Sequence, residues 1–249
     1  GSGVLVRAYG IRVVGKVANI NNRPSFGLFV AASVTIPIPP AIVINEIGGG
    51  FFYNPEANDL ALVRRMAGLS EAANSLVTAS PGSFAVLIYG SATIVEKTLV
   101  SGKVLLTITE NYFSLHGRVV LLNQENSLKG DIYLAIGFNN GFAEGQINVD
   151  LNVVSLIEGK GGMEFYVYGS DAWGIKGNFE AKIIKILNAK TKLFIGNPGF
   201  VMDMKVEMGF DIWIIKVGAG FEGTMRYVRN VSWGAYCKAW IEASVLAGV

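Results

Sequence analysis

Residues 202–212 read Met-Asp-Met-Lys-Val-Glu-Met-Gly-Phe-Asp-Ile, an unbroken alternation of apolar residues with polar residues or glycine. Successive side chains of a β-strand point to opposite sides of a sheet, whereas a helix would spread them around its circumference. The alternation therefore predicts a strand with one apolar side and one polar side. The apolar side consists of Met202, Met204, Val206, Met208, Phe210 and Ile212.

Residues 144–153 repeat this pattern, with polar residues from Glu144 to Asn152 at even positions and apolar residues at odd positions. The two stretches together predict one apolar surface made by alternate strand residues. This candidate ligand or interface face consists of Ile147, Val149, Leu151, Met204, Val206 and Met208. The sequence leaves open whether these residues face a packed core or an open cavity.

A weak internal repeat places a glycine between polar residues, flanked in turn by apolar residues. Gly102, Gly117, Gly130 and Gly145 recur at intervals of 13 to 15 residues, which matches one strand and one tight turn. The repeat predicts an all-β fold, an antiparallel up-and-down meander that forms a curved sheet, a sandwich or a barrel. The apolar residues two and four positions after each glycine place the glycines on the apolar side. Two roles stay open for them, bending the sheet or ending turns.

One segment, residues 55–78, has the apolar spacing of a helix. Asn58 or Asp59 is expected to cap a first helix, Gly68 to end it, and a second short helix to follow. The chain is therefore expected to be a single β-rich domain, 1–249, with a helical insertion. The helical spacing is carried by Leu60, Val63, Met66 and Leu69.

The longest apolar stretch, residues 26–44, contains three prolines that would break a membrane-crossing helix. It is expected to form two strands joined by a proline-rich corner. Residues 84–88, and residues 212–217 apart from Lys216, are apolar at even and odd positions alike. Such strands need cover on both sides, which favours a layer of helix or a second sheet over part of the fold.

Composition points to surplus apolar surface. Apolar residues make up 51% of the chain and charged residues 16%, with a mean hydropathy of +0.42 and a net charge of +2. Soluble domains have roughly 25% charged residues. No basic run is present, which argues against a nucleic-acid partner.

Catalytic, cofactor and metal sites are not expected. The single histidine, His116, and the single cysteine, Cys237, cannot build a Cys/His zinc site, and no nucleophile motif accompanies the histidine. His116 is expected to be a solvated residue on a polar strand side. The aromatic run Phe51, Phe52 and Tyr53 is expected to pack into the core.

Three functions remain open, and none is an enzyme. The first is a structural, self-assembling β module that buries apolar surface against itself or against neighbouring modules of a longer chain. The second is a groove or barrel that binds lipid or another apolar ligand. The third is a transmembrane β-barrel, whose strands of 9 to 11 alternating residues this sequence resembles in pattern.

Overall fold

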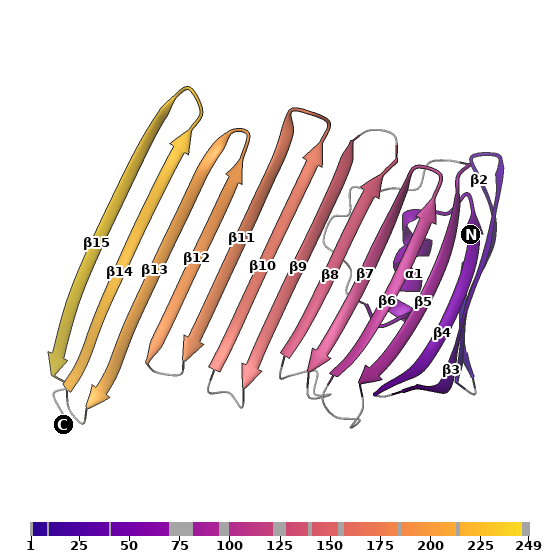
Figure 1. Ribbon diagram of the computed structural model, residues 1–249, viewed down its shortest axis with the longest axis horizontal. Helices are drawn as coiled ribbons and strands as arrows, with labels where there is room; N and C mark the ends of the chain where they lie inside the picture. Colours follow the sequence, from indigo (N-terminus) through magenta and orange to yellow (C-terminus); the bar gives the residue numbers. More distant parts are fainter. Residues whose placement is uncertain are drawn as a thin grey trace. The chain divides into compact units, whose positions relative to one another are not determined.

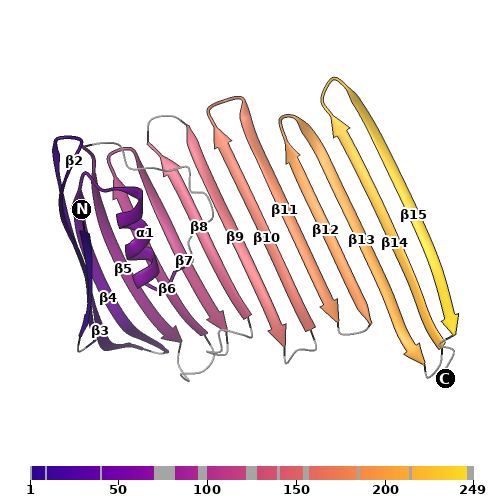
Figure 2. The ribbon, with the colours of Figure 1, turned by 180° about the vertical axis from the view of Figure 1, so that it is seen from behind.

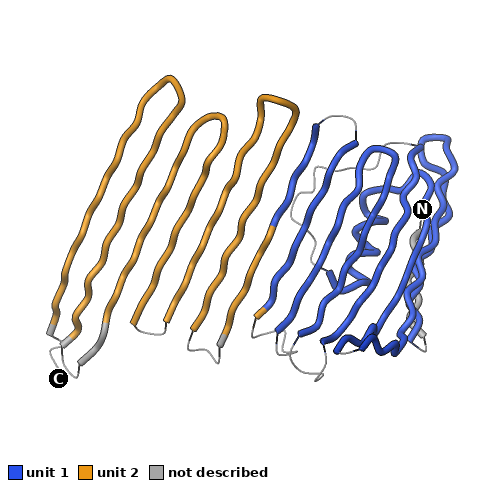
Figure 3. Tube along the Cα trace, in the orientation of Figure 1, with its two compact units in different colours: residues 1–125, 129–146 blue, residues 126–128, 147–249 orange. Residues whose placement is uncertain are grey.

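The computed structural model describes residues 2–8, 10–39, 41–69, 82–94, 100–121, 128–138, 141–153, 157–183, 186–212 and 215–245. The chain forms two compact units, coloured separately in Figure 3. Unit 1 comprises residues 1–125 and 129–146, and unit 2 comprises residues 126–128 and 147–249. Whether they form the single domain expected from the sequence stays a prediction.

The described residues form antiparallel strands that hydrogen-bond in sequence order (Figure 1). The predicted all-β up-and-down meander is confirmed. Unit 1 contains β1 Ser2–Ala8, β2 Ile11–Ile20, β3 Arg23–Ile38, β4 Ile42–Tyr53, β5 Phe84–Ile94, β6 Val100–Thr109, β7 Tyr112–Leu121, all of β8 Leu128–Gly137 except Leu128, and the start of β9 Phe142–Val153. Unit 2 contains the rest of β9, β10 Ile157–Tyr168, β11 Ala172–Ile183, β12 Leu187–Gly196, β13 Gly199–Ile212, β14 Ile215–Val228 and β15 Ser232–Val245.

The proline-rich stretch forms the two strands expected from it. β3 ends at Ile38 and β4 begins at Ile42, with the corner between them. β3 begins after a tight turn in which Asn21 and Asn22 have φ angles of 50° and 61°. Two successive left-handed residues fit the twist of a two-residue hairpin, and asparagine tolerates that conformation better than most residues.

The predicted helix is α1, Ala57–Met66, and it lies on one face of the unit 1 sheet, which curls around it (Figures 1 and 2). Its N-cap is Glu56 rather than Asn58 or Asp59. Asp59 instead lies in the first turn and accepts a hydrogen bond of 2.7 Å from the Glu56 backbone N–H. Gly68 ends the helix with φ +70°, as expected. The predicted second helix falls on residues 70–78, outside the described residues.

A buried core lies between α1 and the curled sheet. Val63 of α1 is fully buried with Phe29, Phe52, Leu87 and other apolar strand residues. Burying each such side chain contributes about 1.5–3 kcal/mol. The core covers Ala85 and Leu87 on one side of β5, whereas Ile88 on the other side is 53% exposed, so the cover expected on both sides of residues 84–88 is present on one side only.

Glycines bring the strands close together beneath α1. A Cβ at Gly27 would lie 2.0 Å from the Phe52 ring, and a Cβ at Gly50 would lie 2.6 Å from the Leu28 carbonyl oxygen. Real Cβ atoms do not approach other heavy atoms so closely. The missing side chain of Gly27 therefore leaves the space that the Phe52 ring occupies, and Gly50 leaves room for the backbone of β3.

Strands β10 to β15 of unit 2 form a single layer (Figure 1). Their registers are continuous, for example from Gly199 opposite Val228 to Ile212 opposite Ile215 between β13 and β14. Among the described residues, every apolar side chain of the buried core belongs to unit 1. The stability of the unit 2 sheet in water therefore rests on strand pairing with little apolar burial.

Candidate functional site

Among the described side chains, one face of the unit 2 sheet is apolar except for Thr191. Residues directly opposite each other in paired strands project to the same side of a sheet, so the registers assign every side chain to a face. One row across β11 to β15 consists of Ile175, Ile195, Phe200, Tyr227 and Trp233. Among the strand residues whose side chains are described, none on this face is charged. We call it the apolar face of unit 2.

All six residues of the predicted apolar surface lie on this face. Met204, Val206 and Met208 stand opposite Thr191, Ala189 and Leu187 of β12. A Cβ built at Gly159, a residue of the apolar face in β10, would lie 3.6 Å from the Leu151 Cβ, which places Leu151 on the same side. Ile147 and Val149 precede Leu151 at alternate positions of β9, so they share its side.

The apolar face of unit 2 is open rather than packed. Phe179 is 55% exposed, Trp233 76% and Ile241 83%. The predicted residues thus line neither a core nor an enclosed cavity. The other large apolar side chains exposed on this face are Ile147, Val149, Ile157, Met163, Val167, Trp173, Ile175, Ile183, Ile195, Met208, Met225 and Tyr227.

The opposite face of unit 2, the charged face, carries the charged strand residues. One row across β10 to β15 reads Lys160, Glu180, Lys190, Lys205, Glu222 and Lys238. Lys190 contacts Glu180 at 2.8 Å, and Lys205 contacts Glu207 at 2.7 Å, with all four side chains at least 38% exposed. Such pairs stabilise a sheet only slightly, so their main effect is to keep this face hydrated.

Unit 1 has the same division between its faces. Its apolar face, the side away from α1, includes Val17, Leu28, Phe51 and Ile88, all at least 44% exposed. The glycines of the internal repeat, such as Gly102 and Gly117, also lie on this face, as expected. The strand charges described in unit 1 lie on the other side, which we call the helix-covered face.

The aromatic run before α1 is divided between these faces. Phe52 is buried beneath α1 with 1% exposure, as expected of a core residue. Phe51 is 44% exposed on the apolar face, and Tyr53 shares its side, so the expectation of core packing is wrong for Phe51. The reason is the strand geometry, which sends neighbouring residues to opposite sides.

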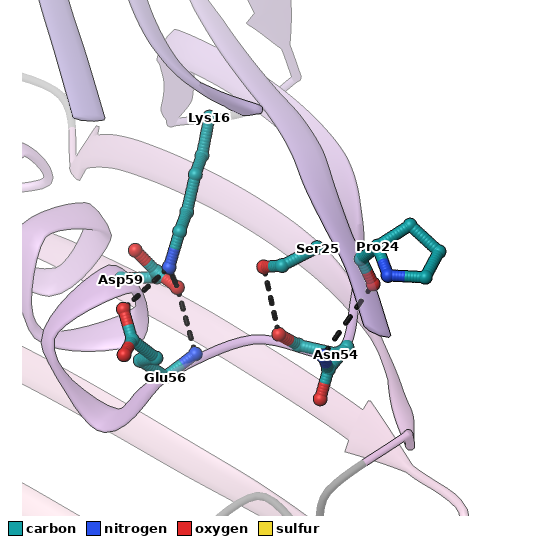
Figure 4. Close-up of polar contacts among 6 residues, drawn as sticks. All are labelled: Lys16, Pro24, Ser25, Asn54, Glu56 and Asp59. Atoms are coloured by element: carbon teal, nitrogen blue, oxygen red, sulfur yellow. Dashed lines mark hydrogen bonds and ion pairs between the residues drawn. The ribbon is translucent and has the colours of Figure 1, made fainter. Parts of the chain in front are cut away.

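Ion pairs attach α1 to the helix-covered face. Lys16 Nζ lies 2.6 Å from Glu56 Oε2 and 2.7 Å from Asp59 Oδ2, as the close-up in Figure 4 shows. The hydrogen bond from Lys16 lowers the pKa of the Glu56 carboxyl, so this group stays ionised. Next to it, the Ser25 hydroxyl donates to the Asn54 carbonyl at 2.8 Å, which fixes the chain just before the helix (Figure 4).

A second polar cluster holds the other end of α1. Arg12 pairs with Glu46 at 2.6 Å and donates a 2.9 Å hydrogen bond to the Met66 carbonyl oxygen. Tyr89 donates a 2.5 Å hydrogen bond to the same Glu46 carboxylate. Arg12 therefore joins the last turn of the helix to β2, and the Glu46 carboxylate of β4 links Arg12 to Tyr89 of β5.

His116 is buried, contrary to the expectation of a solvated side chain. It lies on the helix-covered face with 3% exposure, its ring centroid 4.8 Å from that of Tyr133. Neither ring nitrogen has a hydrogen-bond partner among the described residues. The strand pattern placed His116 on the polar side, but the curl of unit 1 turns that side inward.

Within the described part of the chain, no helix is long and apolar enough to cross a bilayer. The same residues contain no cluster of three or more His, Cys, Asp or Glu side chains placed to hold a metal ion. No protein-family model matches the chain, and no curated protein sequence matches it significantly.

Proposed function

We propose that this chain is a membrane protein whose strands cross a lipid bilayer, with the apolar face of each unit against the hydrocarbon. The observation that carries the proposal is the separation of side chains between faces. The apolar face of unit 2 combines large exposed residues with a complete absence of described charges. Soluble monomers rarely expose apolar patches larger than about 300–600 Å².

The length of the apolar rows supports a crossing orientation. In β10, β11, β14 and β15 the apolar rows span positions 157–167, 173–183, 217–227 and 233–243. Each row is about 33 Å long at roughly 3.3 Å per residue. Tilted by about 40°, such a row covers the apolar band of about 25 Å that a spanning strand presents to lipid.

The charged face supports the same orientation. Lys205, Glu222 and Lys238 occupy the middle of their strands on that face. A lysine facing lipid at the bilayer midplane costs about 2–4 kcal/mol. A sheet with several such charges on one side and none on the other gains free energy only when the uncharged side alone contacts hydrocarbon.

An open apolar face favours a bilayer over a single bound lipid. A site for one lipid is concave and encloses most of its ligand. Phe179 and Ile241 instead stand more than half exposed on an uncovered layer. Self-assembly of the chain would also cover this surface, and the experiment below distinguishes self-assembly from membrane insertion.

The test places the same charge on either side of one strand. Phe179→Lys adds a lysine to the apolar face of β11, and Asn178→Lys adds one to the neighbouring position on the charged face; both positions are exposed. Each full-length variant is refolded from urea with phosphatidylcholine vesicles, and the fraction floating with the vesicles is measured. We expect Asn178→Lys to float like the natural chain and Phe179→Lys to lose about 2–4 kcal/mol of insertion free energy.

Two results would overturn the proposal. One is equal flotation of the two variants, since the bilayer would then not distinguish the faces. The other is a natural chain that stays off the vesicles and shows a defined dimer or larger mass by light scattering without lipid. That second result would assign the apolar face to other copies of the chain.

A further inference from the structure

Aromatic residues of the apolar face are concentrated at one end of the strands in each unit. This aromatic end is where each even-numbered strand turns into the next odd-numbered one. In unit 1, Phe26, Tyr53 and Phe84 stand directly opposite one another on β3, β4 and β5. The Phe26 and Tyr53 ring centroids are 5.5 Å apart.

Unit 2 has an equivalent row. Phe200, Tyr227 and Trp233 stand opposite one another on β13, β14 and β15, next to the turns at residues 197–198 and 229–231. Trp173, the second residue of β11, follows the same kind of turn. Tyr227 is 49% exposed and Trp233 76%, so the rings are not held there by packing within the unit.

The other end of the same face is aliphatic. Ile183, Leu187 and Met208 form a row across β11, β12 and β13 at that end. Among the strand residues whose side chains are described, which leave out 210–215, no Phe, Tyr or Trp of the apolar face of unit 2 lies in the last two strand positions there. Cross-strand aromatic pairs stabilise a sheet wherever they occur, so sheet stability gives no reason for placing them at one end.

Tyrosine and tryptophan combine an apolar ring with a polar group, and they collect where hydrocarbon meets lipid headgroups. We infer that the aromatic end of each unit lies at a membrane–water interface, with Tyr227 and Trp233 at the depth of the lipid carbonyl groups. This inference rests on the proposed membrane location. The inference assigns the aromatic end of the strands to a depth in the bilayer, the boundary between lipid headgroups and acyl chains.

The turns at this end fit an aqueous position. Asn21, Asn22 and Asn230 occupy them with positive φ angles. Asn197 accepts a 2.9 Å hydrogen bond from the Trp173 backbone N–H through its side-chain oxygen. Because these polar turn residues follow the aromatic row directly, the surroundings of the chain change from apolar to polar within a few residues of that row.

The test measures tryptophan depth with phosphatidylcholine brominated near the headgroup or near the acyl terminus. Three full-length variants each keep one tryptophan, with the others changed to Phe. The first keeps Trp233, the second carries Phe221→Trp in the middle of the apolar face of β14, and the third keeps Trp240 on the charged face. Trp213, also replaced, lies outside the described residues.

We expect the fluorescence of Trp233 to be quenched most by the headgroup-brominated lipid, and that of the tryptophan at 221 to be quenched most by the lipid brominated near the acyl terminus. The fluorescence of Trp240 should fall little with either lipid. Trp233 quenched as deeply as position 221 would overturn the interfacial inference and leave the membrane proposal standing. No quenching at Trp233 or at 221 would overturn the membrane proposal itself. If a multiple variant does not fold, Trp233→Phe in the natural chain must remove a shallow-quenched component, and its failure to do so would overturn the inference.

Discussion

Lys16 Nζ lies 2.7 Å from Asp59 Oδ2, and the two side chains are 3% and 10% exposed. The contact joins the second strand to the first turn of the only helix described. Glu56, the second carboxylate on Lys16, is 52% exposed and remains in contact with solvent. The Lys16–Asp59 pair is therefore the buried electrostatic link between α1 and the helix-covered face.

Lys16→Met tests how much this link stabilises the fold. Methionine preserves most of the side-chain volume but leaves the Asp59 carboxylate buried without its cation. Removing one partner of a buried pair costs about 3 kcal/mol or more. We expect the free energy of unfolding, measured by urea titration of the full chain, to fall by that amount.

Lys190→Met is the matched control for Lys16→Met. Lys190 and Glu180 are about half exposed at 2.8 Å, so the same substitution should change stability by less than about 1 kcal/mol. Adding Asp59→Asn to Lys16→Met removes the unpaired charge and should restore part of the loss. Equal effects of the two lysine substitutions would contradict the assignment of a buried link.

Glycines of the two faces should respond differently to a methyl group. A Cβ at Gly27 would meet the Phe52 ring at 2.0 Å, whereas a Cβ at Gly90 would have no atom within 4 Å. We expect Gly27→Ala to destabilise the chain by about 1–3 kcal/mol through overpacking. Gly90→Ala should be neutral or stabilising by up to about 1 kcal/mol. Thermal unfolding of both variants under one condition checks this, and a harmless Gly27→Ala would refute the close packing.

Cys237 reports directly on what covers the apolar face of unit 2. It is exposed and stands opposite Gly223 on that face. A water-soluble maleimide should label it in the lipid-free chain and label it much more slowly after refolding into vesicles, because the thiol then faces hydrocarbon. In a Cys237→Ser chain, Lys238→Cys moves the thiol to the charged face and should react in both states. Equal labelling of both positions in vesicles would contradict the membrane orientation.

The cost of a charge should depend on its position along a strand. Phe179 lies in the interior of β11 and Ile183 at its end, both on the apolar face. If β11 crosses the bilayer, Phe179→Lys should cost about 2–4 kcal/mol of insertion and Ile183→Lys only about 0–1 kcal/mol. Vesicle flotation across a urea series measures both. Equal costs would indicate a sheet lying flat on the membrane rather than crossing it.

Sequence patterns predicted which side of each strand is apolar, because alternation within a strand depends only on local backbone geometry. Met204, Val206 and Met208 share a face for that reason, and the helical spacing of Leu60, Val63 and Met66 predicted α1. The aromatic ends were missed, although Trp173, Phe200 and Trp233 each follow a turn signal in the sequence. That position beside a turn is the signal that could have found them.

The sequence by itself determined the meander, the helix and the separation of charged from apolar sides. Only the tertiary structure decided which sides are covered. Phe51 and Phe52 are alike in the sequence, yet one is exposed and the other buried, since the unit 1 sheet curls and α1 packs on a single side. His116 and Lys16 are buried for the same reason. Curl and helix placement depend on contacts between residues far apart in the chain, such as Lys16 with Asp59, and no local pattern encodes those contacts.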